Sequence, residues 1–322
     1  MKVIDFEQVK AAAENMNPTT WLGWVDYSLR HKSDFQMPPK PRLSQSDGDY
    51  YNIMPALYEK DNLASVKMIG RHSIKRDEKR SVMMSDILLY EADTGILKAL
   101  IDGEYITTLR TGVVAAHSAL LFANKDFNII SLLGLGNIMT VCFKTFIAKL
   151  REDGDNREFT VRLLRHHNQE ERFYNKFKDE PNLHFEFCDT YDSLFDGADI
   201  IISAVTKATE NFSTDRFFKG GGVAVIPICT MGFQNCDLFF DKVFTDEIEQ
   251  IRGFKYFDKF RSVANVSDVL NGVVPGRESE NERILVYDYG LGIHDLYFAS
   301  KFYELIAGQN IEYRYCKEKY FM

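Results

Sequence analysis

The sequence predicts an α/β protein that contains a doubly wound, Rossmann-type dinucleotide domain. From about residue 112 onward, short continuous apolar runs alternate with helical segments, a pattern typical of a parallel sheet covered on both faces. In SLLGLGNIM (131–139), a glycine pair lies between one such run and a helical segment. A length of 322 residues predicts two domains.

The first hundred residues have a different organisation. Residues 5–30 have apolar side chains at three- and four-residue steps and predict helix, with a new helix start at Pro18. Between residues 50 and 101, β-rich runs are separated by turn sequences such as Asp93-Thr94-Gly95. This part of the chain therefore predicts an α+β domain.

The second half predicts alternating helices and strands. We expect helix over 113–122, strand over 127–134, helix over 137–152 and strand over 158–164. Further strands are expected in HFEFCD, ADIIISAV, GGVAVIPIC, DKVFTD and ERILVYDYG.

Composition limits the classes of partner. With 39 basic and 47 acidic residues, the formal net charge of −8 favours neither nucleic acid nor an anionic membrane, and leaves small molecules or other protein chains. Five scattered cysteines, with no apolar run of membrane-spanning length and no signal-like N-terminus, predict a cytoplasmic protein. The seven histidines have no metal-ligand spacing, so we expect no metal site.

The glycine pair predicts a phosphate-binding turn. Gly134 permits a sharp turn, and Gly136 lets the backbone approach a pyrophosphate at the first helical residues, Asn137 and Ile138. Met139 stands where a third small residue usually allows close helix packing. A plain tight turn is the alternative, but the surrounding strand and helix favour a nucleotide site.

The end of the next strand indicates which nucleotide binds. Arg165, His166 and His167 follow it, and no carboxylate appears before Glu170 to accept the ribose hydroxyls of NAD. Cationic and donor groups suit a 2′-phosphate, so NADP(H) is favoured over NAD(H). The alternative is that these side chains belong to a solvated loop.

Several motifs in fixed order resemble the ornithine cyclodeaminase/mu-crystallin family. They are NIMPALY, SVKMIG, ALIDGEYITTLRTGVVAAHSALL, the GLG turn and VYDYGLGIHDLYFA, and they extend from about residue 38 to 300. The resemblance implies a homodimer that acts on the carbon–nitrogen bond of an α-amino or α-imino acid with a nicotinamide cofactor. It also implies a substrate-binding and dimerisation domain of residues 1–112 plus 295–322, and a Rossmann domain of residues 113–294.

The resemblance also implies the roles of individual residues. Arg110 would bind the substrate carboxylate in a bidentate fork, and Lys67 would take part in proton transfer if burial lowers its pKa. Lys40 would be a second carboxylate contact, with Arg42 as a competing alignment. Further positions that match the family are Thr111, Val205 and Thr206 for the cofactor, and Asp288 and Asp295, which are either ligand contacts or helix caps.

One departure from the family's motif bears on the reaction. Cyclodeaminases and the alanine dehydrogenase of the family have an aspartate that handles the substrate amine or its water where this chain has Met231, after Cys229 and Thr230. Our leading hypothesis is therefore an NADP(H)-dependent imine reductase or amino-acid dehydrogenase. The alternatives are a cyclodeaminase-like lyase with retained NAD, a nucleotide-binding protein without turnover, and a structural dimer with a vestigial site.

Overall fold

The chain forms two compact units in the computed structural model. The structure describes residues 1–73, 81–206, 208, 211–212, 215–218, 221–228, 232–233 and 237–316. Unit 1 comprises Met1–Met16, Ser33–Thr107 and Gly292–Met322, and unit 2 comprises Asn17–Lys32 and Thr108–Leu291. The expected division at residues 112 and 295 grouped residues 17–32 with the terminal segments, whereas here they belong to unit 2. None of the helices in the described ranges is long and apolar enough to cross a bilayer.

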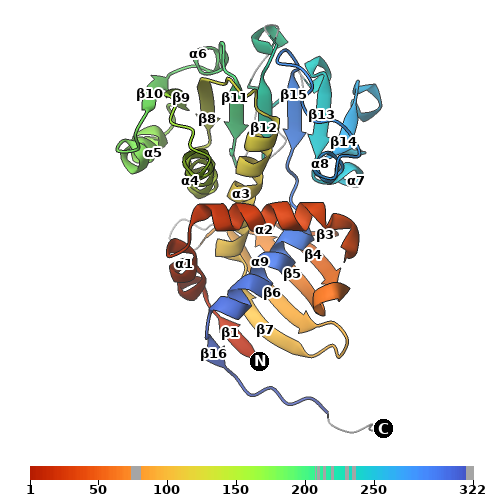
Figure 1. The fold of residues 1–322 in the computed structure, drawn as a ribbon. Coiled ribbons are helices and arrows are strands. Elements are labelled where there is room, and N and C mark those ends of the chain that lie inside the picture. The colour runs from red at the N-terminus through yellow and green to blue at the C-terminus, as the bar shows by residue number, and fades with distance from the viewer. Residues whose placement is uncertain are drawn as a thin grey trace. The chain divides into compact units, whose positions relative to one another are not determined.

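Unit 1 is built on an eight-stranded sheet in the order β16-β1-β7-β6-β5-β4-β2, with β3 also paired to β4. The strands are β1 (Lys2–Ile4), β2 (Phe35–Gln36), β3 (Arg42–Ser44), β4 (Tyr50–Tyr58), β5 (Leu63–Arg71), β6 (Met83–Glu91), β7 (Leu97–Asp102) and β16 (Gln309–Asn310). The β-rich runs expected between residues 50 and 101 are thus confirmed as strands. Because β16 pairs with β1, the two terminal segments of the chain lie side by side at one edge of this sheet (Figure 1).

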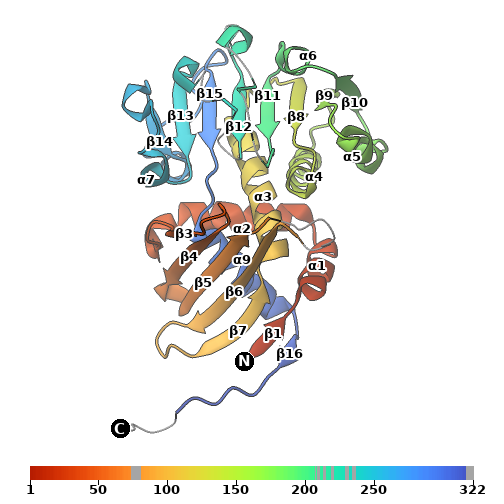
Figure 2. The ribbon, with the colours of Figure 1, turned by 180° about the vertical axis from the view of Figure 1, so that it is seen from behind.

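One face of the unit 1 sheet is covered by helix α9 (Gly292–Leu305), and helix α1 (Phe6–Glu14) packs against α9. The side chains of Met54, Ala56 and Tyr58 alternate along β4 and are buried on that side. Seen from behind, the opposite face of the sheet has no described helix across it (Figure 2).

Unit 2 contains an eight-stranded, wholly parallel sheet in the order β10-β9-β8-β11-β12-β15-β13-β14 (Figure 1). The strands are β8 (Ile129–Leu133), β9 (Phe159–Leu164), β10 (Leu183–Cys188), β11 (Ile200–Ser203), β12 (Ala224–Pro227), β13 (Lys242–Thr245), β14 (Val263–Asn265) and β15 (Ile284–Tyr287). All residues of β11, β12 and β15 are buried, as expected for central strands covered on both faces. The expected doubly wound α/β class is confirmed.

Seven α-helices of unit 2 lie in the described residues, and the start of the first shows how local sequence sets a helix boundary. They are α2 (Pro18–Arg30), most of α3 (Glu104–Phe122), α4 (Asn137–Glu152), α5 (Gln169–Phe177), α6 (Tyr191–Phe195), α7 (Ile248–Ile251) and α8 (Val266–Leu270). Pro18 occupies the first turn of α2, and the side chain of Asn17 caps it. The new helix start expected at Pro18 is therefore confirmed.

Helix α3 begins nine residues before the expected start at residue 113. The Asp102 carboxylate accepts the backbone N–H groups of Glu104 and Tyr105 at 3.3 and 2.8 Å, which satisfies the first donors of the helix. This capping sequence follows β7 directly, so only one residue, Gly103, separates strand from helix.

Candidate active site

The glycine turn of unit 2 has no room for a side chain at its first glycine, Gly134. Gly134 follows β8 with a φ of +76°, and a Cβ atom there would lie 2.4 Å from the carbonyl carbon of Ala204 and 2.5 Å from the backbone nitrogen of Val205. Backbone atoms cannot yield as a flexible side chain can, so any larger residue would displace the loop after β11. The contact brings half-buried Val205 beside the turn, followed by exposed Thr206.

The second glycine leaves the start of helix α4 open. Gly136 is the N-cap residue, and none of the side chains that the structure describes caps the first turn, where Asn137 is exposed and Ile138 is half-buried. Uncapped backbone N–H groups and the positive end of the helix dipole together favour a bound anion. The turn therefore has the chemistry expected of a pyrophosphate site.

Gly112 allows helix α3 to pack closely against the start of helix α4. A Cβ atom on Gly112 of α3 would lie 2.6 Å from the carbonyl oxygen of Ile138 and 2.7 Å from Cβ of Val141. Met139 itself is fully buried in α4. Thr111, a predicted cofactor contact, is half-buried and precedes this glycine on α3.

The turn after β9 is exposed and carries cationic and donor groups. The guanidinium of Arg165 lies 5.3 Å from the ring of Phe187, and its Nε is 3.3 Å from the Asp189 carboxylate. The backbone N–H of exposed His166 donates to the carboxylate of Glu170, which is buried at the start of α5. The Glu170 carboxylate thus already accepts a hydrogen bond from the backbone of the turn.

Unit 1 contains a fully buried ion pair. Lys67 on β5 has no exposed surface, and its Nζ lies 2.7 Å from Oδ2 of Asp295, which is equally buried. Lys67 also donates to the hydroxyl of Thr107 at 3.2 Å. Asp295 lies inside the first turn of α9 rather than before it, so its role in unit 1 is to pair with Lys67. A buried lysine requires such a partner, because an isolated buried charge is very costly.

A second group of buried polar side chains lies in unit 2 around Gly290. Arg110 is only 6% exposed, and a Cβ atom on Gly290 would lie 2.6 Å from its Nη1. The backbone N–H of Gly290 donates to Asp246 at 2.6 Å. Asp288 accepts the hydroxyl of Ser118 at 3.0 Å, and burial, followed by the negative charge of Asp246, raises its pKa well above the usual range.

The remaining predicted residues lie in more open surroundings. Lys40 is half-buried between β2 and β3, while Arg42 on β3 is exposed and stacks its guanidinium 3.7 Å from the ring centre of Tyr50. Cys229, Thr230 and Met231 lie outside the described residues.

Sequence reasoning missed four residues of these groups: Thr107, Gly112, Ser118 and Asp246. Thr107 and Gly112 lie in ALIDGEYITTLRTGVVAAHSALL, but nothing in that stretch shows which partner each would meet. Asp246 ends the DKVFTD run, and Asp288 follows β15, so both stand at carboxyl ends of parallel strands. That position is where open α/β sheets bind ligands, and it was the available signal.

The fold and the glycine turn define a dinucleotide-binding α/β protein. The family model described as "Ornithine cyclodeaminase/mu-crystallin family" matches residues 3–310. The chain belongs to this family, as its motifs indicated.

Curated relatives are distant but match over most of their length. The nodulation efficiency protein NfeD of Rhizobium meliloti is 22% identical over 313 residues, which cover 91% of this chain and 92% of the relative. The N-((2S)-2-amino-2-carboxyethyl)-L-glutamate dehydrogenase of Staphylococcus aureus (strain NCTC 8325 / PS 47) is 23% identical over 297 residues, 87% of each chain.

Solved structures share the fold. An archaeal alanine dehydrogenase dimer with bound NAD superposes with a TM-score of 0.81 at 19% identity, covering 98% of this chain and 99% of that one. The Δ1-pyrroline-2-carboxylate reductase of Thermococcus litoralis, in complex with NADH and L-proline, gives 0.79 at 17% identity, with coverage of 97% and 100%.

The raised pKa of Asp288 makes stability depend on pH. The unfolded chain releases this proton near the ordinary value of 3.8, whereas the folded protein retains it, so wild-type stability falls as pH rises above that value. Asp288→Asn removes this dependence and keeps an oxygen acceptor for Ser118. We expect the unfolding free energy of the variant to increase relative to that of wild type as the pH is raised from the ordinary value of 3.8 toward neutral, because only wild type loses stability there.

Urea titrations of both proteins across this pH range measure the difference. A difference between variant and wild type that stays constant with pH would contradict the raised pKa.

Proposed function

We propose that the protein is an NADP(H)-dependent oxidoreductase that acts on the carbon–nitrogen bond of an α-imino or α-amino acid. The observation that carries this proposal is the buried pair of Lys67 and Asp295, because Lys67 stands in the SVKM motif of a family whose relatives include amino-acid dehydrogenases. Lysines that serve only structure are rarely fully buried, whereas Lys67 is. A buried lysine held beside a carboxylate is suited to proton transfer.

Each proposed role follows from the chemistry of imine reduction. When bound, the nicotinamide cofactor supplies or accepts the hydride. Lys67, held by Asp295 and Thr107, delivers the proton to the imine nitrogen or removes it from the amine. Arg110 and Lys40 bind the substrate carboxylate, since a guanidinium matches a carboxylate in a planar fork.

The residues at the glycine turn fit a dinucleotide. The uncapped start of α4 after Gly136 suits the pyrophosphate, with Asn137 and Ile138 in its first turn. Thr111, Val205 and Thr206 are proposed as further cofactor contacts.

Reduction is favoured over cyclodeamination. Met231 cannot accept a proton or bind an ammonium group, whereas reduction of a formed imine needs only a hydride, a proton and a carboxylate contact. Two of the similar solved structures are an alanine dehydrogenase and a pyrroline-carboxylate reductase, which supports the same class of reaction.

The test is cofactor oxidation by the purified protein. We expect NADPH to be consumed when Δ1-pyrroline-2-carboxylate or a mixture of a keto acid and an amine is added. A double variant, Lys67→Met with Asp295→Asn, leaves no buried charge unpaired and should bind NADPH but lose about 10²- to 10⁴-fold in turnover. The absorbance of the reduced nicotinamide follows the reaction.

Other outcomes separate the alternatives. Consumption of ornithine without net change of the nicotinamide would establish the lyase. Cofactor binding without turnover of any imine would leave a binding protein, and absence of cofactor binding would overturn the proposal.

NADP(H) preference is proposed from the turn after β9. Arg165 and His166 are exposed there and offer charge and hydrogen bonds to a 2′-phosphate, although the two similar structures described above contain NAD or NADH. Arg165→Ser should weaken NADPH binding about tenfold and leave NADH binding unchanged. Nicotinamide fluorescence titrations measure both affinities.

Arg172 offers a matched control. It is an exposed arginine on the adjoining helix α5, and Arg172→Ser should change neither affinity. Wild-type protein that binds both cofactors equally well would contradict the assignment of Arg165.

A homodimer is proposed from the uncovered face of the unit 1 sheet. Val66 on β5 lies between Pro55 and Leu88 of the neighbouring strands, and Met68 lies next to Ile53. These side chains point away from α9, because Lys67 between them points toward it. Met68 is 42% exposed and has Asp86 as its neighbour on β6, and a group of exposed apolar side chains on one face of a sheet marks a protein interface.

A charge on this face should separate the subunits. We expect Val66→Lys to convert a dimer to a monomer in light scattering, because Val66 lies between Pro55 and Leu88 and a lysine there would bring an unpaired charge into the apolar interface. Val273→Lys, at an exposed apolar residue of unit 2, should leave the dimer intact. A Val66→Lys protein that remains dimeric would place the interface elsewhere.

A further inference from the structure

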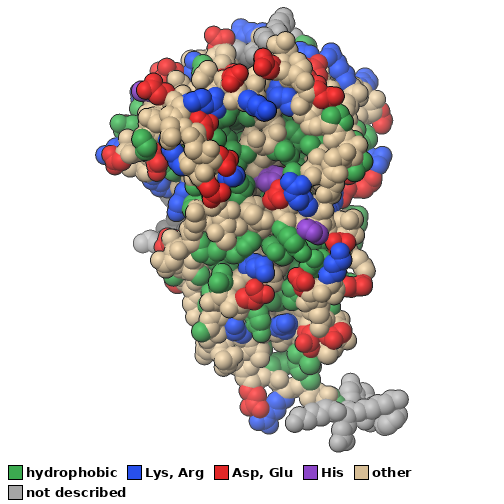
Figure 3. Space-filling view, viewed as in Figure 1, with side chains coloured by type: hydrophobic (Ala, Val, Ile, Leu, Met, Phe, Trp, Pro, Cys, Tyr) green, Lys and Arg blue, Asp and Glu red, His purple; other side chains and the backbone are tan. Residues whose placement is uncertain are grey.

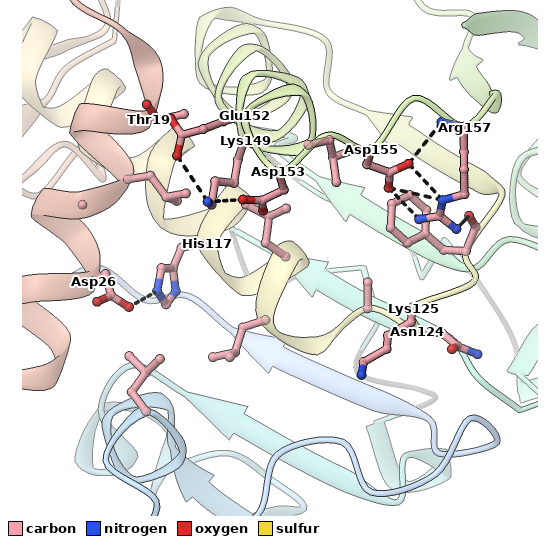
Figure 4. Close-up of a pocket in the computed structure, with 18 of the residues that line it drawn as sticks. Thr19, Asp26, His117, Asn124, Lys125, Lys149, Glu152, Asp153, Asp155 and Arg157 are labelled. Atoms are coloured by element: carbon pink, nitrogen blue, oxygen red, sulfur yellow. Dashed lines mark hydrogen bonds and ion pairs between the residues drawn. The ribbon is translucent and has the colours of Figure 1, made fainter.

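Unit 2 contains a cavity that the proposed reaction does not use. It has a volume of about 600 Å³ and is bounded by α2, by the ends of α3 and α4 with the segments that follow them, and by Leu270 of α8 (Figure 4). On the face of the molecule in Figure 3, hydrophobic side chains line a hollow edged by side chains of both charges.

The cavity lies near the amino ends of the strands of unit 2, whereas the glycine turn lies at their carboxyl ends. Its lining includes Asn124–Phe127, just before β8, and Asp153–Arg157, just before β9, apart from Asp126, Gly154 and Asn156. These segments stand at the amino ends of parallel strands, whereas Gly134 follows the carboxyl end of β8. A ligand in the cavity is therefore not the dinucleotide bound at the turn.

The charges around the cavity balance one another. Four acidic and four basic side chains line it, namely Asp26, Glu152, Asp153, Asp155, Arg30, Lys125, Lys149 and Arg157. Asp26 pairs with Arg30 at 2.6 Å. Asp155 pairs with Arg157 at 2.8 Å, and Lys149 contacts both Glu152 and Asp153 (Figure 4). Since seven of these eight side chains already have an opposite charge beside them, the site favours a neutral ligand over an ionic one.

The rest of the lining is largely apolar. Leucines from four helices contribute, together with the ring of Phe127; they are Leu22, Leu120, Leu121, Leu150 and Leu270. An apolar body would gain free energy by displacing water from this surface.

His117 is the exception in this lining. The side chain is 8% exposed, and its Nε2 lies 3.2 Å from Oδ1 of Asp26. Among the described residues, its other ring nitrogen, Nδ1, is buried and has no hydrogen-bond partner. Figure 4 shows this nitrogen on the side of the ring away from Asp26, toward other lining residues.

The neighbours of His117 determine what Nδ1 can bind. Hydrogen bonds from His117 and then Arg30 lower the pKa of Asp26 to about 2, against the opposing effect of burial, so its carboxylate is ionised near neutral pH. An ionised carboxylate accepts, so Nε2 carries a hydrogen, and when that is the only hydrogen on the ring nitrogens Nδ1 is left as an acceptor. The outer torsion of a histidine is soft, and because Nδ1 is buried the ring has to turn for this nitrogen to meet a ligand.

We propose that this cavity binds a small neutral molecule with an apolar body and one hydroxyl or N–H group that donates a hydrogen bond to Nδ1 of His117. The leucines take the apolar body, and the balanced charges exclude a strongly ionic ligand. Helix α3 carries both His117 and Arg110, so a ligand in the cavity would contact the helix that holds the proposed carboxylate contact.

Indole and 1-methylindole test this proposal as matched probes. Both are neutral and apolar, but only indole has an N–H donor. We expect indole to bind with about 3- to 10-fold higher affinity than 1-methylindole in calorimetric titrations, the effect of one hydrogen bond. In a His117→Phe variant the difference should disappear, and in His117→Asn, which keeps an oxygen acceptor near the place of Nδ1, part of it should return.

A second variant locates the probe independently of His117. Leu121→Trp fills the cavity and should abolish indole binding, while NADPH binding at the glycine turn stays unchanged and shows that unit 2 is folded. Equal affinity for the two probes, no binding of indole, or binding that survives Leu121→Trp would each overturn the proposal.

Discussion

The pairing of Lys67 with Asp295 is the interaction on which the arrangement of unit 1 depends. Both side chains are fully buried, so the ammonium group on β5 is tolerated only because the carboxylate of α9 lies 2.7 Å away. Removing one partner of such a pair costs about 3–5 kcal/mol, a large part of the stability of an ordinary domain. The pair therefore fixes α9 on the sheet and holds the ammonium group in one place, which a proton-transfer residue requires.

The nucleotide side of the protein depends on backbone contacts instead. Gly134 touches the loop after β11, and Gly112 of α3 touches the first turn of α4. A Rossmann turn usually has a third small residue on the helix itself, and here Met139 fills that position as a buried side chain. The close approach at the start of α4 is made from the neighbouring helix, so the motif departs from the usual pattern while the open helix end remains.

Much of this architecture is readable from the sequence. Helix α4 has the bounds expected from its periodicity, and the continuous apolar runs are strands of a parallel sheet, because burial on both faces leaves no polar alternation. The three-residue edge strand β14 was missed because so short a run has no period. The partner of Lys67 was not identified either, since pairing across most of the chain leaves no local signal, and the cap of Asp102 on α3 was hidden by its position at the end of a strand.

The order of segments along the chain also sets an order of folding during synthesis. All of unit 2 has been translated once residue 291 is made, whereas unit 1 still lacks α9 and the edge strand β16. At roughly 5–20 residues per second, the Lys67 ammonium group exists for about ten seconds or more before Asp295 does. Until then β5 cannot bury that charge beside its partner, so the sheet of unit 1 stays incompletely packed on the ribosome, and α9 completes it.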